Sequence, residues 1–221
     1  MGTTPINAGL VIDLNQAGDG TTASGFRHAL AVLLQQSAPG VPVPGRLGSA
    51  HFVVQGQPDM SYVVSGGGVV LTRSSQGAYV VGIDRDTAVS TGPSNGVNPR
   101  IDRVYVHQPD PALDGPAIDV RAFIGVASSD PASQPQVPPI PVGALELARY
   151  LVPASATHTE ALVPTNVAPV VGLNFGTVPV NQGGTGASTP AGARQALGIT
   201  SGQAAPSNNV GTDGDIYFQI L

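Results

Sequence analysis

The chain has 221 residues, a net charge of −5 and only 10% charged residues, against about 25% in an average soluble domain. It contains no Cys, which excludes disulfides and thiolate metal sites, and it lacks a basic cluster of the kind that binds nucleic acid. No apolar run approaches the roughly 20 residues of a membrane span, and the first residues lack the features of a signal peptide. A surface this poor in charge suits a protein largely covered by partners in an assembly.

The N-terminal part is predicted to contain an extended arm followed by one helix. The arm covers residues 1–20, and Leu10–Leu14 (LVIDL) within it has the character of a short strand. Apolar residues then recur at helical spacing at Phe26, Leu30, Leu33 and Leu34. Thr21, Thr22 or Ser24 is available to cap the start of this helix, and Pro39-Gly40 is expected to end it.

From about residue 50 the apolar period changes to two, which predicts strands. The segments are HFVVQG (51–56), SYVVSGGGVVLTR (61–73), GAYVVGIDR (77–85), DRVYVHQ (102–108) and AIDVRAFIGVA (117–127). Residues 65–68 (SGGG) are expected to form a hairpin turn within the second segment. The last segment has the clearest alternation, with Ile118, Val120, Ala122, Ile124 and Val126 on one face.

A proline-rich crossing at 131–141 precedes an ambiguous segment at 144–153. Leu147 and Leu151 suit a helix, whereas Ala148, Tyr150 and Val152 suit one face of a strand. We favour a strand, because the proline at 153 leaves little room for a helix. The predicted fold is mainly β: an antiparallel, jelly-roll-like β-sandwich over 21–163 with one N-terminal helix. A Pro-rich linker over 164–180 then leads to a small C-terminal oligomerisation module over 181–221.

The glycine-rich stretch at 180–199 (VNQGGTGASTPAGARQALGI) has the strand, loop and helix order of a phosphate site. A dinucleotide fingerprint would need a glycine where Thr189 stands, and a Walker loop would need a Lys, which the chain lacks. No cofactor is therefore expected. Thr189 suits the cap of the helix, Pro190 its first position and Gly198 its end. The apolar face of so short a helix cannot hold a lone module, so association between copies is expected.

Other candidate sites have plainer interpretations. His28, His51, His107 and His158 lack metal-ligand spacing, and no metal site is expected. Asp110 and Asp114 are weak candidates for calcium ligands, and the segment that carries them is more simply interpreted as a turn between strands. Arg100, Asp102 and Arg103 fit either a ligand-binding cluster or a fixed ion pair that orients a strand, and the second is favoured. Paired acids for glycoside hydrolysis depend on the fold, and the chain has only two glutamates, Glu146 and Glu160.

Two stretches carry a resemblance to a family. NQGGTGASTPAGARQALGI (181–199) resembles a motif, N-x-G-G-T-G-A-x-T-x-x-x-A-R-x-x-L-G-[IL], that is common in bacteriophage tail fibre and tail tip proteins. The segment DGDIYFQ (213–219) is similar to the closing strand of such proteins. Residues 27–163 resemble the N-terminal domain of minor tail proteins, through NPRIDRVYV, the strand and proline crossing after it, and LELARYLVPA. The chain differs in lacking shaft repeats or a large distal head.

The resemblance implies a structural virion protein and no enzyme. Its expected place is the virion tail (tail tip, baseplate or short fibre), after assembly in the host cytoplasm, with roles in assembly and host attachment. The expected partners are further copies in a homotrimer, other virion proteins and a host cell-surface glycan or protein, with no nucleic acid and no membrane insertion. A capsid decoration or head fibre protein and a wall-polysaccharide hydrolase are the alternatives. The candidate oligomer-interface residues are Gly183, Gly184, Thr185, Gly186, Ala193, Arg194, Leu197, Ile216 and Phe218.

Overall fold

Strands dominate the computed structural model, which describes residues 16–17, 20–73, 76–172, 184–187, 189–202 and 216–219. The chain divides into two units, Met1–Asn174 and Phe175–Leu221. The first unit contains α1 (Ala23–Ala31), β1 (Gln36–Ala38), β2 (Val41–Pro42), β3 (Gly45–Arg46), β4 (Val54–Gly56), β5 (Ser61–Val64), β6 (Gly67–Thr72), β7 (Ala78–Ile83), β8 (Thr87–Ser90), β9 (Arg100–His107), α2 (Pro111–Asp114), β10 (Phe123–Ser128), β11 (Leu145–Val152) and β12 (Pro164–Val167). The second contains α3 (Pro190–Ala196), β13 (Ile199–Gly202) and β14 (Ile216–Gln219).

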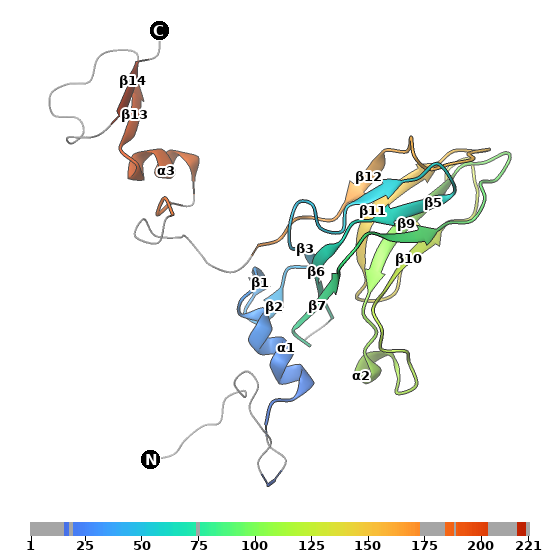
Figure 1. The fold of residues 1–221 in the computed structure, drawn as a ribbon, viewed down its shortest axis with the longest axis horizontal. Coiled ribbons are helices and arrows are strands. Elements are labelled where there is room, and N and C mark those ends of the chain that lie inside the picture. The colour runs from blue at the N-terminus through green and yellow to red at the C-terminus, as the bar shows by residue number, and fades with distance from the viewer. Residues whose placement is uncertain are drawn as a thin grey trace. The chain divides into compact units, whose positions relative to one another are not determined.

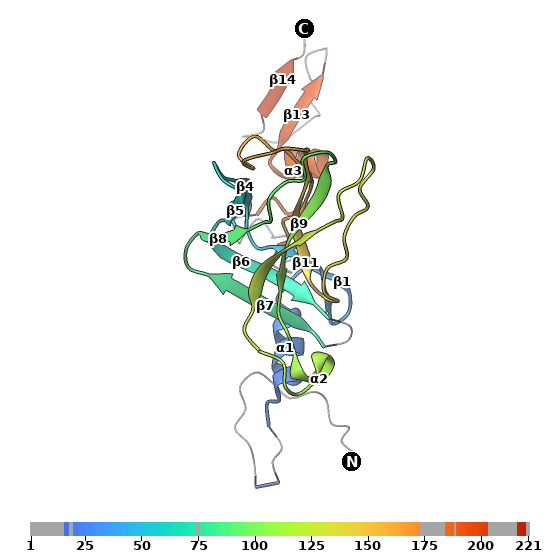
Figure 2. The same cartoon turned by 90° about the vertical axis from the view of Figure 1, so that its right-hand side faces the viewer.

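The first unit is built from antiparallel sheets that enclose one main core, which confirms the predicted fold class. One sheet has the strand order β10-β9-β11-β12, and two three-stranded sheets have the orders β3-β6-β7 and β4-β5-β8 (Figures 1 and 2). Side chains of β5, β6 and β7 pack with those of β9 and β11 in a single buried cluster. Apolar residues at alternate positions of facing strands therefore meet, as in a β-sandwich.

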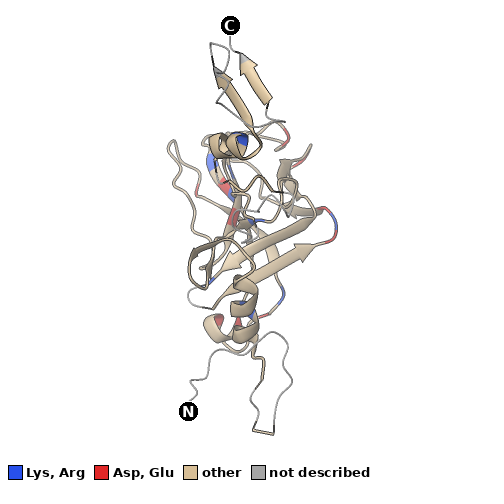
Figure 3. Cartoon of the chain, turned by 90° about the vertical axis from the view of Figure 1, so that its left-hand side faces the viewer, with Lys and Arg blue, Asp and Glu red and all other residues tan. Residues whose placement is uncertain are grey.

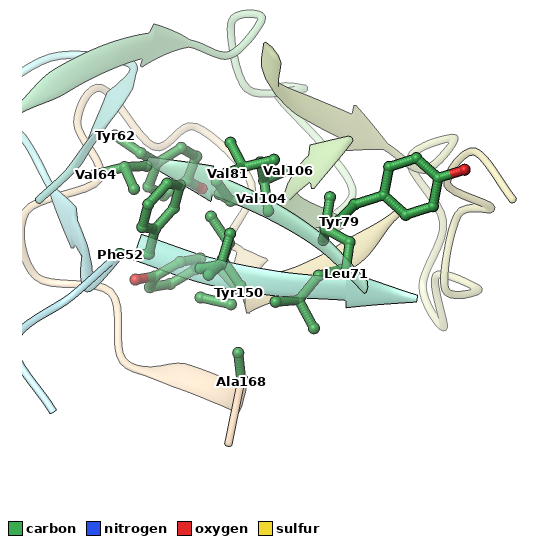
Figure 4. Packing of buried hydrophobic residues seen from close by; sticks show 14 residues of the cluster. Phe52, Tyr62, Val64, Leu71, Tyr79, Val81, Val104, Val106, Tyr150 and Ala168 are labelled. Atoms are coloured by element: carbon green, nitrogen blue, oxygen red, sulfur yellow. The ribbon is translucent and has the colours of Figure 1, made fainter. Parts of the chain in front are cut away.

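Aromatic side chains fill one part of this core (Figure 4). The rings of Tyr62 and Tyr150 stack with centroids 4.8 Å apart, and Phe52 is fully buried in the same cluster. Each tyrosine hydroxyl has a partner, since Tyr62 donates to Asp102 and Tyr150 donates to the carbonyl of Val54 at 3.0 Å. Hydrogen bonding of both hydroxyls offsets the cost of burying them.

Helix α1 begins as predicted but is shorter than predicted. The hydroxyl of Thr22 accepts a hydrogen bond from the N–H of Gly25 at 3.0 Å, which caps the start. The helix ends at Ala31, well before Pro39: Leu33 N and Leu34 N donate to the carbonyls of Leu30 and Ala31 in tighter turns, and Gln35 N already donates to Gly172 O. Of the predicted apolar face, only Leu34 is buried, whereas Phe26 and Leu33 are exposed.

The predicted hairpin at 65–68 is wrong. β5 pairs with β4 and β8, whereas β6 pairs with β3 and β7, so the chain passes between two sheets at this point. Gly67 has a φ of 134°, and a Cβ there would lie 2.5 Å from the ring of His51. The glycines therefore allow a close crossing past His51 and do not form a two-strand turn.

The segment with the clearest alternation is a strand only in its second half. β10 begins at Phe123, opposite His107 of β9, and residues 117–122 pair with no strand in the part of the chain that the structure describes. Beyond His107 the chain meets Pro109 and Pro111, which lack an N–H, and turns into α2. The expected partner strand therefore stops, and Ile118 and Val120 remain exposed.

The ambiguous segment at 144–153 is a strand, as predicted, but the predicted linker at 164–180 begins with a further strand. β11 pairs with β9 on one side and with β12 on the other. Ala168 and Val171, just beyond β12, are buried, and Val171 N donates to Arg46 O at 2.8 Å. Pro164 is tolerated because it stands at the first position of an edge strand. The sandwich unit thus extends to about Asn174.

Candidate assembly interface

Helix α3 of the second unit is set up by its flanking residues, as predicted. The hydroxyl of Thr189 accepts from the N–H of Gly192 at 3.1 Å, and Pro190 occupies the first turn. Gly198 follows the last helical residues with a φ of 66°, and its N–H donates to Gln195 O at 3.1 Å. A polar cap, an N-terminal proline and a left-handed glycine fix a helix of only seven residues.

The helix leads directly into a two-stranded parallel sheet. The expected terminal strand is present as β14. β13 was not predicted, because its residues Ile199–Gly202 include two small polar residues and a glycine and show no apolar alternation. Ile199 lies opposite Ile216, and Ser201 lies opposite Phe218. A two-stranded sheet alone is marginal in water, and no described residue of this unit is buried, so the sheet is expected to need a partner surface.

Large apolar side chains of this unit are exposed. Leu197 is 53% exposed at the end of α3, and Ile216 and Phe218 on β14 are 52% and 57% exposed. Ile216 and Phe218 lie on the same face of β14, because side chains alternate along a strand. Within residues 184–187, 189–201 and 216–218, no side chain is buried. The described part of the unit therefore exposes an apolar surface and lacks a core of its own.

The remaining predicted interface residues lie on or just before the helix. Ala193 and Arg194 are on α3, where Ala193 is half-buried and Arg194 is exposed. Gly184, Thr185 and Gly186 precede the helix, and Gly186 has a φ of 67°, which favours glycine. Gly183 lies outside the described residues. The structure thus joins Leu197 to the β13–β14 pair through Gly198, whose carbonyl accepts from Ile216 N at 2.9 Å.

Arg100 and Asp102 form a fixed ion pair, which confirms the favoured interpretation of this cluster. Arg100 Nε lies 2.8 Å from Asp102 Oδ1, and the Asp102 side chain is fully buried. Asp102 also accepts from the hydroxyls of Thr91 at 2.8 Å and Ser128 at 2.7 Å. The pKa of Tyr62 lies well above its usual value, mainly because the hydroxyl is buried and secondly because the negative charge of Asp102 is close to it. Because every group is satisfied, the cluster fastens β9 to its neighbours and leaves no free charge for a ligand.

A second charged group centres on Glu146. Its carboxylate accepts from Arg103 Nε and Arg149 Nε, each at 2.8 Å, and from the amide of Asn166 at 3.1 Å. Burial alone would raise the pKa of Glu146, but the hydrogen bonds from Arg149, Asn166 and Arg103 lower it below its usual value. The ionised side chain of Glu146 thus links β9, β11 and β12 through its hydrogen bonds.

Asp110 and Asp114, the calcium candidate, also make hydrogen bonds that hold the fold together. The segment expected to be a turn is the short helix α2. Asp110 caps α2 by accepting from Ala112 N at 2.9 Å, and it also accepts from the hydroxyl of Tyr79. Arg73 donates to both oxygens of Asp114, at 2.5 and 2.6 Å. The hydrogen bond from Arg73 lowers the pKa of Asp114 far below its usual value. Both carboxylates therefore have protein partners in place of a cation.

Two further findings concern ligands and membranes. Within the described ranges, no group of three or more His, Asp or Glu side chains is placed to hold a metal ion. In the same ranges, no helix is both long and apolar enough to cross a membrane. Charged residues are sparse along the ribbon (Figure 3). Five of the seven ion pairs among the described residues have largely buried side chains, and the other two, Arg85–Asp84 and Arg121–Asp119, are exposed pairs between residues close in the sequence.

No family model, no curated protein and no solved structure matches this chain.

Proposed function

We propose that this protein is a structural component of a tailed-bacteriophage virion, in the tail tip, baseplate or a short fibre. Three copies associate through their C-terminal units, and the β-sandwich docks on neighbouring virion proteins during assembly and host attachment. The observation that carries the proposal is the exposure of Leu197, Ile216 and Phe218 on a unit whose described residues include none that is buried. The motif at 181–199, which resembles tail fibre and tail tip proteins, covers the same unit.

The properties of the first unit support a structural role. Several of its buried charges are paired and hydrogen-bonded, as Asp102 with Arg100 and Glu146 with Arg103 show. Such groups fix the strands relative to one another. A rigid module with a surface poor in charge suits permanent contacts with neighbouring proteins, because interface cores are depleted of charged residues.

Three carboxyl groups of the sandwich, those of Asp110, Asp114 and Glu146, do not fit the role of the catalytic acid in the hydrolase alternative. A glycoside hydrolase needs an acid whose pKa is raised, so that it carries a proton at neutral pH. The pKa values of Asp110, Asp114 and Glu146 are all lowered. The main hydrogen bonds that lower them come from Tyr79 to Asp110, from Arg73 to Asp114 and from Arg149 to Glu146, with smaller effects from other donors. These acids are held in the ionised form and serve as acceptors in the fold.

The experiment that tests the proposal is light scattering of the full chain after size-exclusion chromatography. The proposal predicts a mass three times the 22.2 kDa of one chain at micromolar concentration. Leu197→Ser and Phe218→Ser should lower that mass while the circular dichroism of the sandwich is retained. A folded full-length monomer at micromolar concentration would overturn the proposed trimer.

A further inference from the structure

One side of the sandwich is open along the edge of β7. β7 is the last strand of the sheet β3-β6-β7, and β10 is the last strand of the facing four-stranded sheet. Two hollows are lined by successive residues of β7: one of about 510 Å³ at Ala78–Val80 and one of about 220 Å³ at Val81–Ile83. We refer to these two hollows together as the β7 groove.

The walls and floor of the β7 groove are largely apolar. α1 contributes Phe26 and Leu30 to one wall, and Val120 and Phe123 lie on the opposite side. The floor of the smaller hollow includes Phe52, which belongs to the main core. The groove therefore opens onto the core at a place where another strand would complete the layer.

The backbone of β7 is paired on one side only. Every residue from Ala78 to Ile83 lies opposite a residue of β6. The other edge of β7 receives no backbone hydrogen bond from any residue that the structure describes. Unpaired N–H and C=O groups along an apolar groove form a template for an added strand.

We propose that the occupant of the β7 groove is the segment Leu10–Leu14 (LVIDL) of this protein, which adds a strand to the free edge of β7. In an extended segment Leu10, Ile12 and Leu14 share one face, and Val11 and Asp13 share the other. The first face is entirely apolar and fits the floor formed by the main core. The single charge, at Asp13, then lies on the side away from that floor.

The position of the arm in the chain makes this occupant available. Ala23, the first residue of α1, lines the larger hollow. The nine residues from Leu14 to Ala23 reach at most about 30 Å when extended, so the segment can enter the groove of its own copy or of an adjacent one. The five residues of the segment span about 17 Å, which matches most of the six-residue edge of β7. The inference concerns the sandwich alone and stands whether or not the C-terminal units associate.

Amide hydrogen exchange of the full chain tests this inference. In the wild type, the β7 N–H groups that point into the groove should be protected, and the triple variant Leu10→Ser/Ile12→Ser/Leu14→Ser should exchange them at least about tenfold faster. Amides of β6, which pair within the sheet, should not change. Val142→Ser, at a side chain that is 86% exposed, is the matched control and should leave β7 unchanged. Equal exchange of β7 in the wild type and the triple variant would overturn the inference.

Cross-linking identifies the donating copy. Because the chain has no Cys, the full-length variant Val11→Cys/Val80→Cys presents only the two introduced thiols. A short bismaleimide should join them far more efficiently than in Val11→Cys/Val97→Cys, since Val97 lies outside the groove and is 81% exposed. A product of single-chain mass shows that the arm occupies its own groove, and a product of twice that mass shows exchange between copies. Equal yields from the two variants would contradict docking in the groove.

Discussion

Replacing Phe218 with Ser is expected to weaken association of the chain without unfolding the sandwich. Phe218 is 57% exposed on β14 and shares a face with Ile216, which is 52% exposed. The substitution removes a large apolar side chain from the second unit and leaves the sequence of the first unit unchanged. Any loss of association then reports on the C-terminal surface itself.

The size of the effect follows from the exposed fraction. Full burial of a Phe side chain contributes about 1.5–3 kcal/mol, so covering the exposed half contributes about 1.2 kcal/mol per copy. A trimer contains three such side chains, and their loss amounts to about 3.5 kcal/mol, or roughly a 300-fold fall in the trimer association constant. The association constant is the trimer concentration divided by the third power of the monomer concentration. The midpoint concentration therefore varies as the inverse square root of this constant and rises roughly 20-fold.

Light scattering or sedimentation across a dilution series measures this midpoint. Val142→Ser is the control, because it removes an apolar side chain that is 86% exposed in the other unit. It should leave the midpoint where the wild type has it. A midpoint for Phe218→Ser within about twofold of the wild type would refute the assignment of this surface to the interface.

Three further predictions concern the sandwich. Asp102→Asn leaves the buried guanidinium of Arg100 without its charged partner and should lower the urea unfolding free energy by about 3–5 kcal/mol, whereas Asp119→Asn, in an exposed pair, should change it by less than about 1 kcal/mol. The fold lowers the pKa of Glu146, so its ionised carboxylate stabilises the folded protein. This contribution to the unfolding free energy is fully present above the unfolded pKa of about 4.3 and is lost as pH falls through the lower pKa of the folded state. Glu146→Gln should therefore flatten the acid side of the urea-midpoint profile, and an unchanged profile would contradict this. Gly77→Ala should lower the melting temperature, because Gly77 has a φ of 80° and a Cβ there would lie 2.7 Å from the α1 backbone.

Among the predicted strands, β5, β9 and much of β11 show an alternation of apolar residues that matches burial on a paired strand, whereas β6 buries three consecutive residues. Val104 and Val106 of β9 and Leu147 and Tyr150 of β11 face the core, and both strands have neighbours on each side. The same pattern at residues 117–122 failed because the adjoining β9 ends at His107, before the prolines. Apolar alternation in the sequence predicts which face of a strand is buried. Whether a neighbouring strand is present to pair with it depends on residues elsewhere in the chain.

Glycine and proline patterns were informative only where their effect is local. The caps of α3 could be predicted because Thr189, Pro190 and Gly198 act within one turn of the helix. The glycines at 66–68 suggested a hairpin, yet they serve the crossing past His51, which lies 16 residues from Gly67 in the sequence. The braces around Asp102 and Glu146 also depend on long-range partners, and only the proximity of Arg100 to Asp102 was visible in the sequence.

The proposed place of this protein in a phage tail is tested most directly by labelling of intact particles. If the proposal holds, an antibody against this chain, bound to virions purified from cells that produce the chain and viewed by electron microscopy, should decorate the tail tip, baseplate or fibres. Decoration of the capsid would support the head-protein alternative and contradict the tail assignment. Absence of the chain from purified virions would contradict a structural role altogether.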